Sequence, residues 1–198
     1  ETVLPEDFDG VFRFTNWSDE DFLAKWDSKE YRFPAKKRTP MVIVNASPHV
    51  GRIFYMRQWT PDAEPTAPDC FSNDGRAPDA GAANPQSDRC DSCPQNIKGS
   101  GQGNSKACRY SRRLAMVLTE DFGTSLEGEV YQMNLASKSL FGESGIDNAF
   151  TFENYTKYLA NNGKSLDYVV TTISFNENND NASVLFTPAR FINKDQYA

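Results

Sequence analysis

Four cysteines constrain this chain more than any other feature, because they fall in the one long stretch that has no hydrophobic pattern. Cys70, Cys90, Cys93 and Cys108 follow the spacing C-x19-C-x2-C-x14-C. From residue 60 to about residue 105, Pro, Gly, Asp, Asn and Ser dominate the sequence. A stretch of that length without apolar periodicity is uncommon inside a compact domain unless something other than burial organises it.

A metal ion is the organiser that this spacing favours. The CxxC pair can place two thiolates on one ion from a single tight turn, and the two outlying cysteines complete four ligands. Metal binding then supplies the folding free energy that burial cannot supply here. A site of four thiolates has no open position for water, so it is structural rather than catalytic. The sequence therefore predicts one structural Zn²⁺ ion held by Cys70, Cys90, Cys93 and Cys108.

Two other uses of these cysteines stay open. Two disulfides would suit a secreted domain, although disulfide frameworks are typical of shorter chains than this one of 198 residues. A redox CxxC usually opens a helix after a strand, and the segment Asp88-Arg-Cys-Asp-Ser-Cys-Pro94 follows no strand pattern. Zinc fits better than either alternative.

Outside this stretch the hydrophobic pattern predicts strands and few helices. Strands are expected over 11–15, 41–45, 52–59, 113–118, 129–134, 168–175 and 183–186. The second and third of these would form a hairpin around the turn at 47–51. A short helix is expected after Ser18, with Phe22, Leu23 and Trp26 on one face, and a longer helix over 150–161, ended by Gly163.

These elements predict a β-rich α+β fold. We expect a small, OB-like, partly open β-barrel with one or two short helices, and a β-sandwich is the alternative. Residues 1–198 would form a single OB-like domain, with 60–113 as an inserted zinc-binding loop that carries the four cysteines. No run of about 18 apolar residues occurs, which predicts no membrane contact. Because residue 1 is Glu, a removed leader leaves a secreted alternative open.

The net charge of −6 is distributed unevenly. Residues 1–30 contain nine acids and three bases, whereas residues 31–60 contain six bases and no acid. From Arg89 to Arg113, six bases accompany one acid, Asp91. Two basic blocks in an acidic chain indicate a local site for a polyanion. The acidic first segment could itself occupy that site between binding events.

Aromatic residues coincide with the basic blocks, and single strands are bound by basic grooves with rings on which bases stack. Alternation over 52–59 would place Ile53, Tyr55, Arg57 and Trp59 on one face. The alternative is that Tyr55 and Trp59 belong to the core. The residues expected to contact a single strand are Arg13, Trp17, Lys36, Lys37, Arg38, Arg52, Tyr55, Arg57, Trp59, Lys106, Arg109, Tyr110, Arg112 and Arg113.

Catalytic patterns are scarce, and the chain is expected not to be an enzyme. The single histidine, His49, lies in a predicted turn without an obvious partner. Gly99-Ser-Gly-Gln-Gly103 lacks the preceding strand and following helix of a phosphate-binding loop. Carboxylates are plentiful, so a carboxylate-metal nuclease stays open as an alternative, as does a structural or protein-interaction protein such as a virion component.

A resemblance adds to this interpretation. Cys90-Asp-Ser-Cys-Pro94, Gly99-Ser100, Lys106-Ala-Cys108 and Arg112-Arg113-Leu114 together resemble a run in bacteriophage proteins, some of them similar to phage single-stranded DNA-binding proteins. The resemblance covers about a quarter of the chain. It implies a phage origin, the cytoplasm of a bacterial host, and a role in DNA replication or recombination with single-stranded DNA and replication proteins as partners. Proteins of that function often end in an acidic tail, whereas this chain ends Asn193-Lys-Asp-Gln-Tyr-Ala198.

Overall fold

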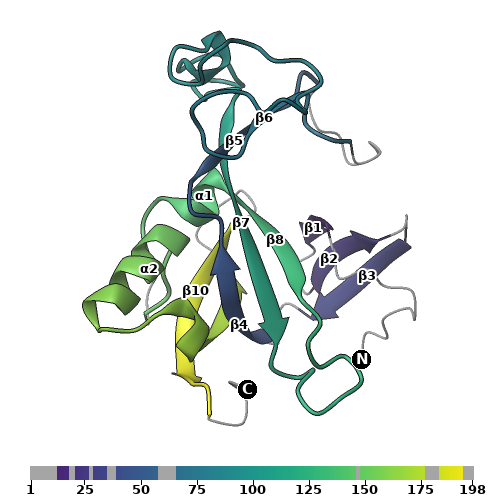
Figure 1. Cartoon of the computed structure of the whole chain (residues 1–198), viewed down its shortest axis with the longest axis vertical. Helices are drawn as coiled ribbons and strands as arrows, with labels where there is room; N and C mark the ends of the chain where they lie inside the picture. The colour runs from purple at the N-terminus through teal and green to yellow at the C-terminus, as the bar shows by residue number, and fades with distance from the viewer. Residues whose placement is uncertain are drawn as a thin grey trace. The chain divides into compact units, whose positions relative to one another are not determined.

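The computed structural model describes residues 13–17, 21–26, 29–34, 39–57, 66–145, 148–176 and 183–193. The chain forms two compact units, one of residues 1–46 with 113–198 and the other of residues 47–112 (Figure 1). The second unit is therefore inserted in sequence between the two halves of the first. The sequence predicts an inserted loop at 60–113, so the compact unit begins earlier than that loop.

The first unit is built on an antiparallel sheet. Its strands are β4 (Thr39–Ala46), β7 (Arg109–Leu118), β8 (Tyr131–Ala136), β9 (Val169–Phe175) and β10 (Val184–Phe191). They lie in the order β10-β9-β4-β7, and β8 pairs with β7. Burial alternates along β8, where Tyr131, Met133 and Leu135 are buried and the residues between them are not. This period of two confirms the strand predicted there.

Helix α2 (Phe152–Asn161) supplies much of the core of this unit. Its residues Phe152 and Tyr155 are fully buried, and both rings lie against the ring of Phe186 in β10. The Tyr155 hydroxyl also lies 2.6 Å from the Thr171 hydroxyl, which gives two buried polar groups a partner. Gly163 ends the helix as predicted, because it takes φ of 64° while the N–H of the next residue bonds back to the helix.

Three strands near the N-terminus form a separate antiparallel meander. They are β1 (Arg13–Trp17), β2 (Asp21–Trp26) and β3 (Lys29–Pro34), paired in that order. The helix predicted after Ser18 is therefore wrong over Asp21–Trp26. Six residues are too few for a helical period to be distinguished from a strand, and pairing with both neighbours decides the outcome.

The unit 47–112 contains little regular structure. It has β5 (Gly51–Phe54), β6 (Cys70–Ser72), the first residues of β7 and the short 3₁₀ helix η1 (Pro94–Asn96). β5 pairs with β6 on one side and with β7 on the other. A Cβ atom on Gly51 would lie 2.5 Å from the carbonyl oxygen of Ser72, so the close approach of β5 and β6 requires glycine there.

The hairpin predicted from 41–45 and 52–59 does not form. β4 and β5 each pair with β7, β4 with Leu114–Leu118 and β5 with Arg109–Ser111. Both strands therefore pair with β7 rather than with each other. β5 also ends at Phe54, five residues earlier than predicted, where its pairing with the three-residue β6 ends.

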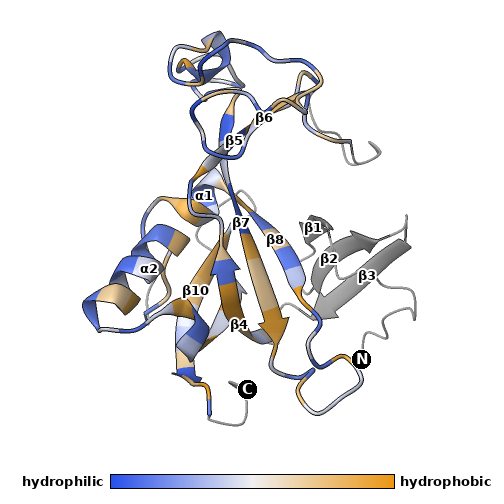
Figure 2. Ribbon diagram, in the orientation of Figure 1, coloured by the Kyte–Doolittle hydropathy of each residue, from blue (hydrophilic) through white to orange (hydrophobic). Residues whose placement is uncertain are grey.

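The β-rich α+β class is confirmed, with a seven-stranded sheet and two short α-helices, α2 and α1 (Ser137–Leu140), in the described residues. The 3₁₀ helix η2 (Leu166–Tyr168) precedes β9. Figure 2 shows the arrowhead half of β7 as hydrophobic and the loops of the unit 47–112 as mostly hydrophilic. No helix in the described ranges is both long enough and apolar enough to cross a membrane.

Candidate functional site

The four cysteines line one small cavity in the unit 47–112. Cys70 opens β6, Cys90 and Cys93 flank a tight turn before η1, and Cys108 directly precedes β7. The cavity has a volume of about 10 Å³, which is close to the space of one water-sized sphere. The four cysteines, which span 38 positions in sequence from Cys70 to Cys108, thus line the same cavity.

Backbone hydrogen bonds hold the cysteine loops in place. The N–H of Cys90 donates to the carbonyl of Arg76 at 2.8 Å, and the N–H of Cys108 donates to the carbonyl of Gln95 at 2.8 Å. The N–H of Asn96 donates to the carbonyl of Cys93 at 2.9 Å and closes the turn into η1. Three of the cysteines are buried, and Cys70 is half-buried.

Burial controls the electrostatics of these thiols. The pKa of the Cys108 thiol is raised to about 11, mainly by burial; the positive charge of Arg52 opposes this rise and the neighbouring cysteines add to it. Burial likewise raises the pKa of Cys90, partly offset by a hydrogen bond with Ser72 and by Arg52. The two thiols are therefore protonated at neutral pH.

The cysteines share a cavity as free thiols. Within the described ranges, no three side chains of His, Cys, Asp or Glu stand as a set that could hold a metal ion in their present arrangement. Four thiols are nonetheless a donor set that closed structural zinc sites use. The cavity therefore brings the right groups together without closing them into a coordination shell.

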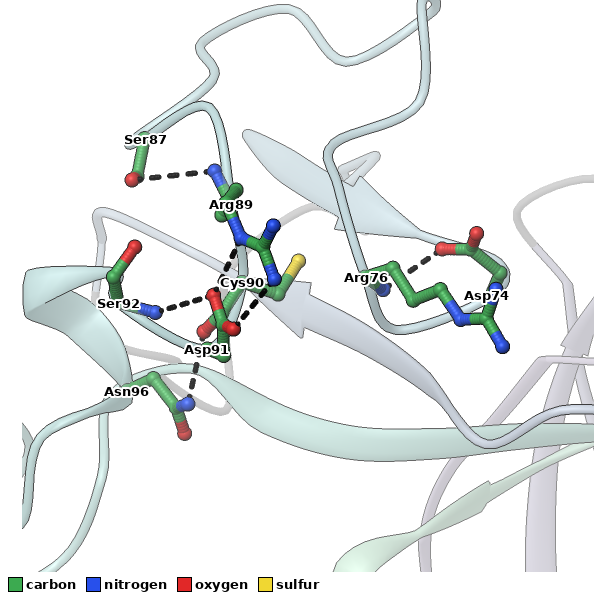
Figure 3. A network of polar contacts seen from close by, with 8 residues as sticks. All are labelled: Asp74, Arg76, Ser87, Arg89, Cys90, Asp91, Ser92 and Asn96. Carbon is green, nitrogen blue, oxygen red and sulfur yellow. Dashed lines mark hydrogen bonds and ion pairs between the residues drawn. The ribbon is translucent and has the colours of Figure 1, made fainter.

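A polar network includes Arg52 and Arg89, which also line the cavity. Asn96 donates from Nδ2 to the carbonyl of Cys90 at 2.9 Å (Figure 3). Its Oδ1 accepts hydrogen bonds from Arg52 at 2.6 Å and from Lys106 at 3.0 Å. Arg89 lies on the other side of Cys90 and pairs with Asp91 through two hydrogen bonds, both drawn in Figure 3.

The structure describes part of the β5 region that is predicted to bind nucleic acid. Because the strand ends at Phe54, the alternation expected through Arg57 does not continue. Tyr55 is nevertheless 45% exposed, and Arg57 is exposed as well. Phe54 is buried, whereas Met56, two residues later, is exposed.

The bases in and before β7 have different environments. Arg109 is exposed, whereas the half-buried Tyr110 has the Arg52 guanidinium 4.0 Å from its ring centroid. Arg112 donates from Nε to the carbonyl of Ser47 at 2.9 Å. Arg113 is exposed and belongs to the first unit.

Several predicted residues cannot be compared with the structure. Lys36, Lys37, Arg38 and Trp59 lie outside the described residues. Arg13 and Trp17 are the end residues of β1, and their side chains are likewise outside the described part.

Two features of this unit were not predicted from the sequence. One is a row of register partners across the small sheet, in which Phe71 of β6, Ile53 of β5 and Arg109 of β7 lie side by side. The other is Asn96, whose amide joins two cations to the cysteine turn. A three-residue strand has no detectable period, and an asparagine after a CxxCP run carries no signal of its own.

Comparison of the chain with protein-family models, with curated proteins and with solved structures found no match. The resemblance to phage single-stranded DNA-binding proteins therefore stays a prediction, and function has to be argued from the residues themselves.

Proposed function

We propose that the protein binds single-stranded DNA without sequence preference, through the unit 47–112, and that this unit is organised by one zinc ion held by Cys70, Cys90, Cys93 and Cys108. The observation that carries the proposal is the pairing of β5 with β7. It joins two runs, 39–57 and 92–119, in which no Asp or Glu occurs. Two neighbouring strands thus come from the acid-free parts of an acidic chain, which favours a polyanionic ligand.

The side chains around these strands have the two chemistries that single strands require. Arg57 and Arg109 are exposed cations suited to phosphates, and the exposed ring of Tyr55 is suited to stacking on a base. Ile53 is half-buried and is the register partner of Arg109, which adds an apolar side chain next to this cation. One carboxylate lies next to this segment, because Asp69 accepts a hydrogen bond from the N–H of Met56 at 2.8 Å.

The zinc part of the proposal is supported by how little the unit buries. In its described part, the buried residues are Gly51, Phe54, Ser72, Cys90, Cys93 and Cys108. Phe54 is the one large apolar side chain among them. Burial of one Phe contributes about 1.5–3 kcal/mol, whereas ordering each residue costs about 1–2 kcal/mol. A metal bond network is the remaining source of folding free energy that the cysteine cavity can offer.

Two finer predictions accompany the proposal. An OB-like barrel stays a prediction, since the pairing order among the described strands runs from β10 to β6 and joins them in an open path. A role in phage replication or recombination, in the cytoplasm of a bacterial host, stays a prediction from the resemblance. The competing functions are a structural virion protein, in which the basic strands would meet an acidic protein, and a carboxylate-metal nuclease.

The proposal is tested by titrating the zinc-loaded protein against labelled oligonucleotides at several salt concentrations. We expect tighter binding to single strands than to duplex of the same length, with little dependence on sequence. Tyr55→Ala should weaken binding by about 1–3 kcal/mol at an unchanged salt slope. Arg109→Ala should flatten the salt slope by about one unit, because one phosphate contact is lost.

Arg190→Ala is the matched control, because Arg190 is an exposed arginine of the other unit. It should leave both affinity and salt slope unchanged. Equal affinity for duplex and single strand would indicate a general polyanion surface instead. Absence of binding at low salt would leave the structural protein as the better explanation.

A further inference from the structure

Two cations of the unit 47–112 converge on one neutral oxygen. Nη1 of Arg52 lies 2.6 Å from Oδ1 of Asn96, and Nζ of Lys106 lies 3.0 Å from the same atom. Like charges this close repel, and both side chains are half-buried, which weakens the screening by water. Such a pair is favourable only where negative charge lies nearby.

No carboxylate supplies that charge in the described part of the chain. Besides Asn96, Arg52 bonds to the hydroxyl of Tyr110 at 3.2 Å and lies over its ring, and Lys106 has Asn96 as its partner. The nearby ion pair is formed by Arg89 and Asp91, which neutralise each other at the surface. What Arg52 does face is the cysteine cavity, which it lines together with all four cysteines.

We propose that Arg52 and Lys106, joined through Asn96, are positioning residues that balance the charge of the four-thiolate zinc centre. The inference rests on the zinc site of the proposed function. A divalent ion with four thiolates retains two negative charges, and two cations balance them. Asn96 couples the cations to the ligands, because its amide also holds the backbone carbonyl of Cys90. Groups around a metal centre that orient its ligands commonly set its affinity.

The assignment separates the basic residues of this unit into two groups, one for the metal centre and one for nucleic acid. The charge pattern of the sequence grouped Arg52 and Lys106 with the residues that contact nucleic acid. In the structure both are directed to Asn96, while Arg57 and Arg109 are exposed. Stacking on Tyr110 fixes the Arg52 guanidinium in this inward orientation. The two cations bound to Asn96 therefore act on the metal centre, and the exposed ones are left to act on phosphate.

The test is zinc affinity, measured by competition with a chromophoric chelator in the full chain. Arg52→Ala and Lys106→Gln should each lower the affinity by roughly 10–100-fold. Lys106→Gln keeps a donor for Asn96 but removes the charge, so it separates charge from packing. Lys106→Arg and Arg52→Lys keep the charge and should recover most of the affinity. Lys98→Ala is the matched control, because Lys98 is an exposed lysine of the same loop region, and it should bind zinc as the parent does.

Cobalt substitution gives a second measurement that overall stability does not affect. The thiolate-to-cobalt absorption should saturate at the same intensity in Lys106→Gln as in the parent, but at a higher cobalt concentration. A parental zinc affinity in both Lys106→Gln and Arg52→Ala, with a flatter salt slope for DNA in either variant, would overturn the inference and return these cations to the DNA surface. If Arg52→Ala does not fold, the Lys106 variants decide. A parent protein that binds no zinc would refute the proposed function itself.

Discussion

Removal of the metal is expected to unfold one unit of the chain and leave the other intact. Structural zinc contributes apparent binding free energies of about 10–16 kcal/mol, far more than the burial of Phe54 can contribute. The first unit has its own core, in which Phe152, Tyr155 and Phe186 are fully buried. Chelation should therefore cost the unit 47–112 all of its stability and the first unit little.

Amide hydrogen exchange with mass spectrometry can measure both units at once. In the zinc-loaded protein we expect protection of the Cys90 and Cys108 amides, which donate to Arg76 and Gln95, and of the Phe186 amide, which donates to Phe150. After chelation the two cysteine amides should exchange as in an unstructured chain, because their carbonyl partners are held only by the folded loops. The Phe186 amide should keep its protection.

A pair of variants in the cysteine turn serves as the control. Cys93→Ser should reproduce the effect of chelation, whereas Ser92→Ala, at the adjacent exposed position, should not. Equal protection of the cysteine amides with and without metal would refute the reasoning, because the unit would then be stabilised by its own packing. Two disulfides in the intact mass would refute it as well.

Further predictions concern the first unit and one residue outside the described part. The buried carboxylate of Asp121 accepts a 2.8 Å hydrogen bond from Tyr131, and burial raises the pKa of this carboxyl group, so the folded state loses stability as pH rises and Asp121 ionises. In urea titrations, Asp121→Asn should therefore gain stability relative to the parent as pH rises from about 3 to about 7. A stability difference that does not vary with pH would contradict this. Phe152→Ala should lower the free energy of unfolding by about 3–5 kcal/mol in the same assay, and a loss below about 1 kcal/mol would mean that its site collapses freely. Gly163→Ala should cost about 1 kcal/mol, because alanine resists the positive φ of this helix end, and thermal melts measure it. Trp59→Ala should weaken single-strand binding by about 1–3 kcal/mol, and a blue-shifted fluorescence indifferent to oligonucleotide would assign the ring to the core instead.

Local sequence patterns correctly predicted the helices and strands whose structure depends little on pairing with neighbouring segments. The helix over 150–161 carries aromatic residues at helical spacing and a glycine after its end, and α2 begins two residues later than predicted. Asp21–Trp26 was predicted wrongly because Phe22, Leu23 and Trp26 fit either period over six residues, and strands on both sides settled the choice. β5 was predicted too long because its own alternation continues, whereas its partner β6 has three residues.

In the candidate site, too, local sequence predicted some features and strand pairing decided the others. The spacing of the cysteines indicated that they act together, and they line one cavity. The charge pattern located the basic residues but could not separate Arg52, directed to Asn96, from Arg109, which is exposed. That distinction depends on the register of β5 against β7, which places Arg52 opposite Tyr110 and Ile53 opposite Arg109. A shift by one residue would exchange the two faces, and no local sequence signal excludes it.

The place where the chain enters and leaves the unit 47–112 has an evolutionary consequence. Ala46 and Leu114 are register partners in the first unit, and Gly51 and Ser111 are partners in the second. Segments whose two ends are adjacent can be gained or lost in a single genetic event without disturbing the host fold. A two-residue Asn-Gly turn between Ala46 and Leu114 would close β4 and β7 into an ordinary hairpin. An ancestor that lacked the cysteine unit is therefore structurally feasible, and the same junction is a site at which other modules could be grafted.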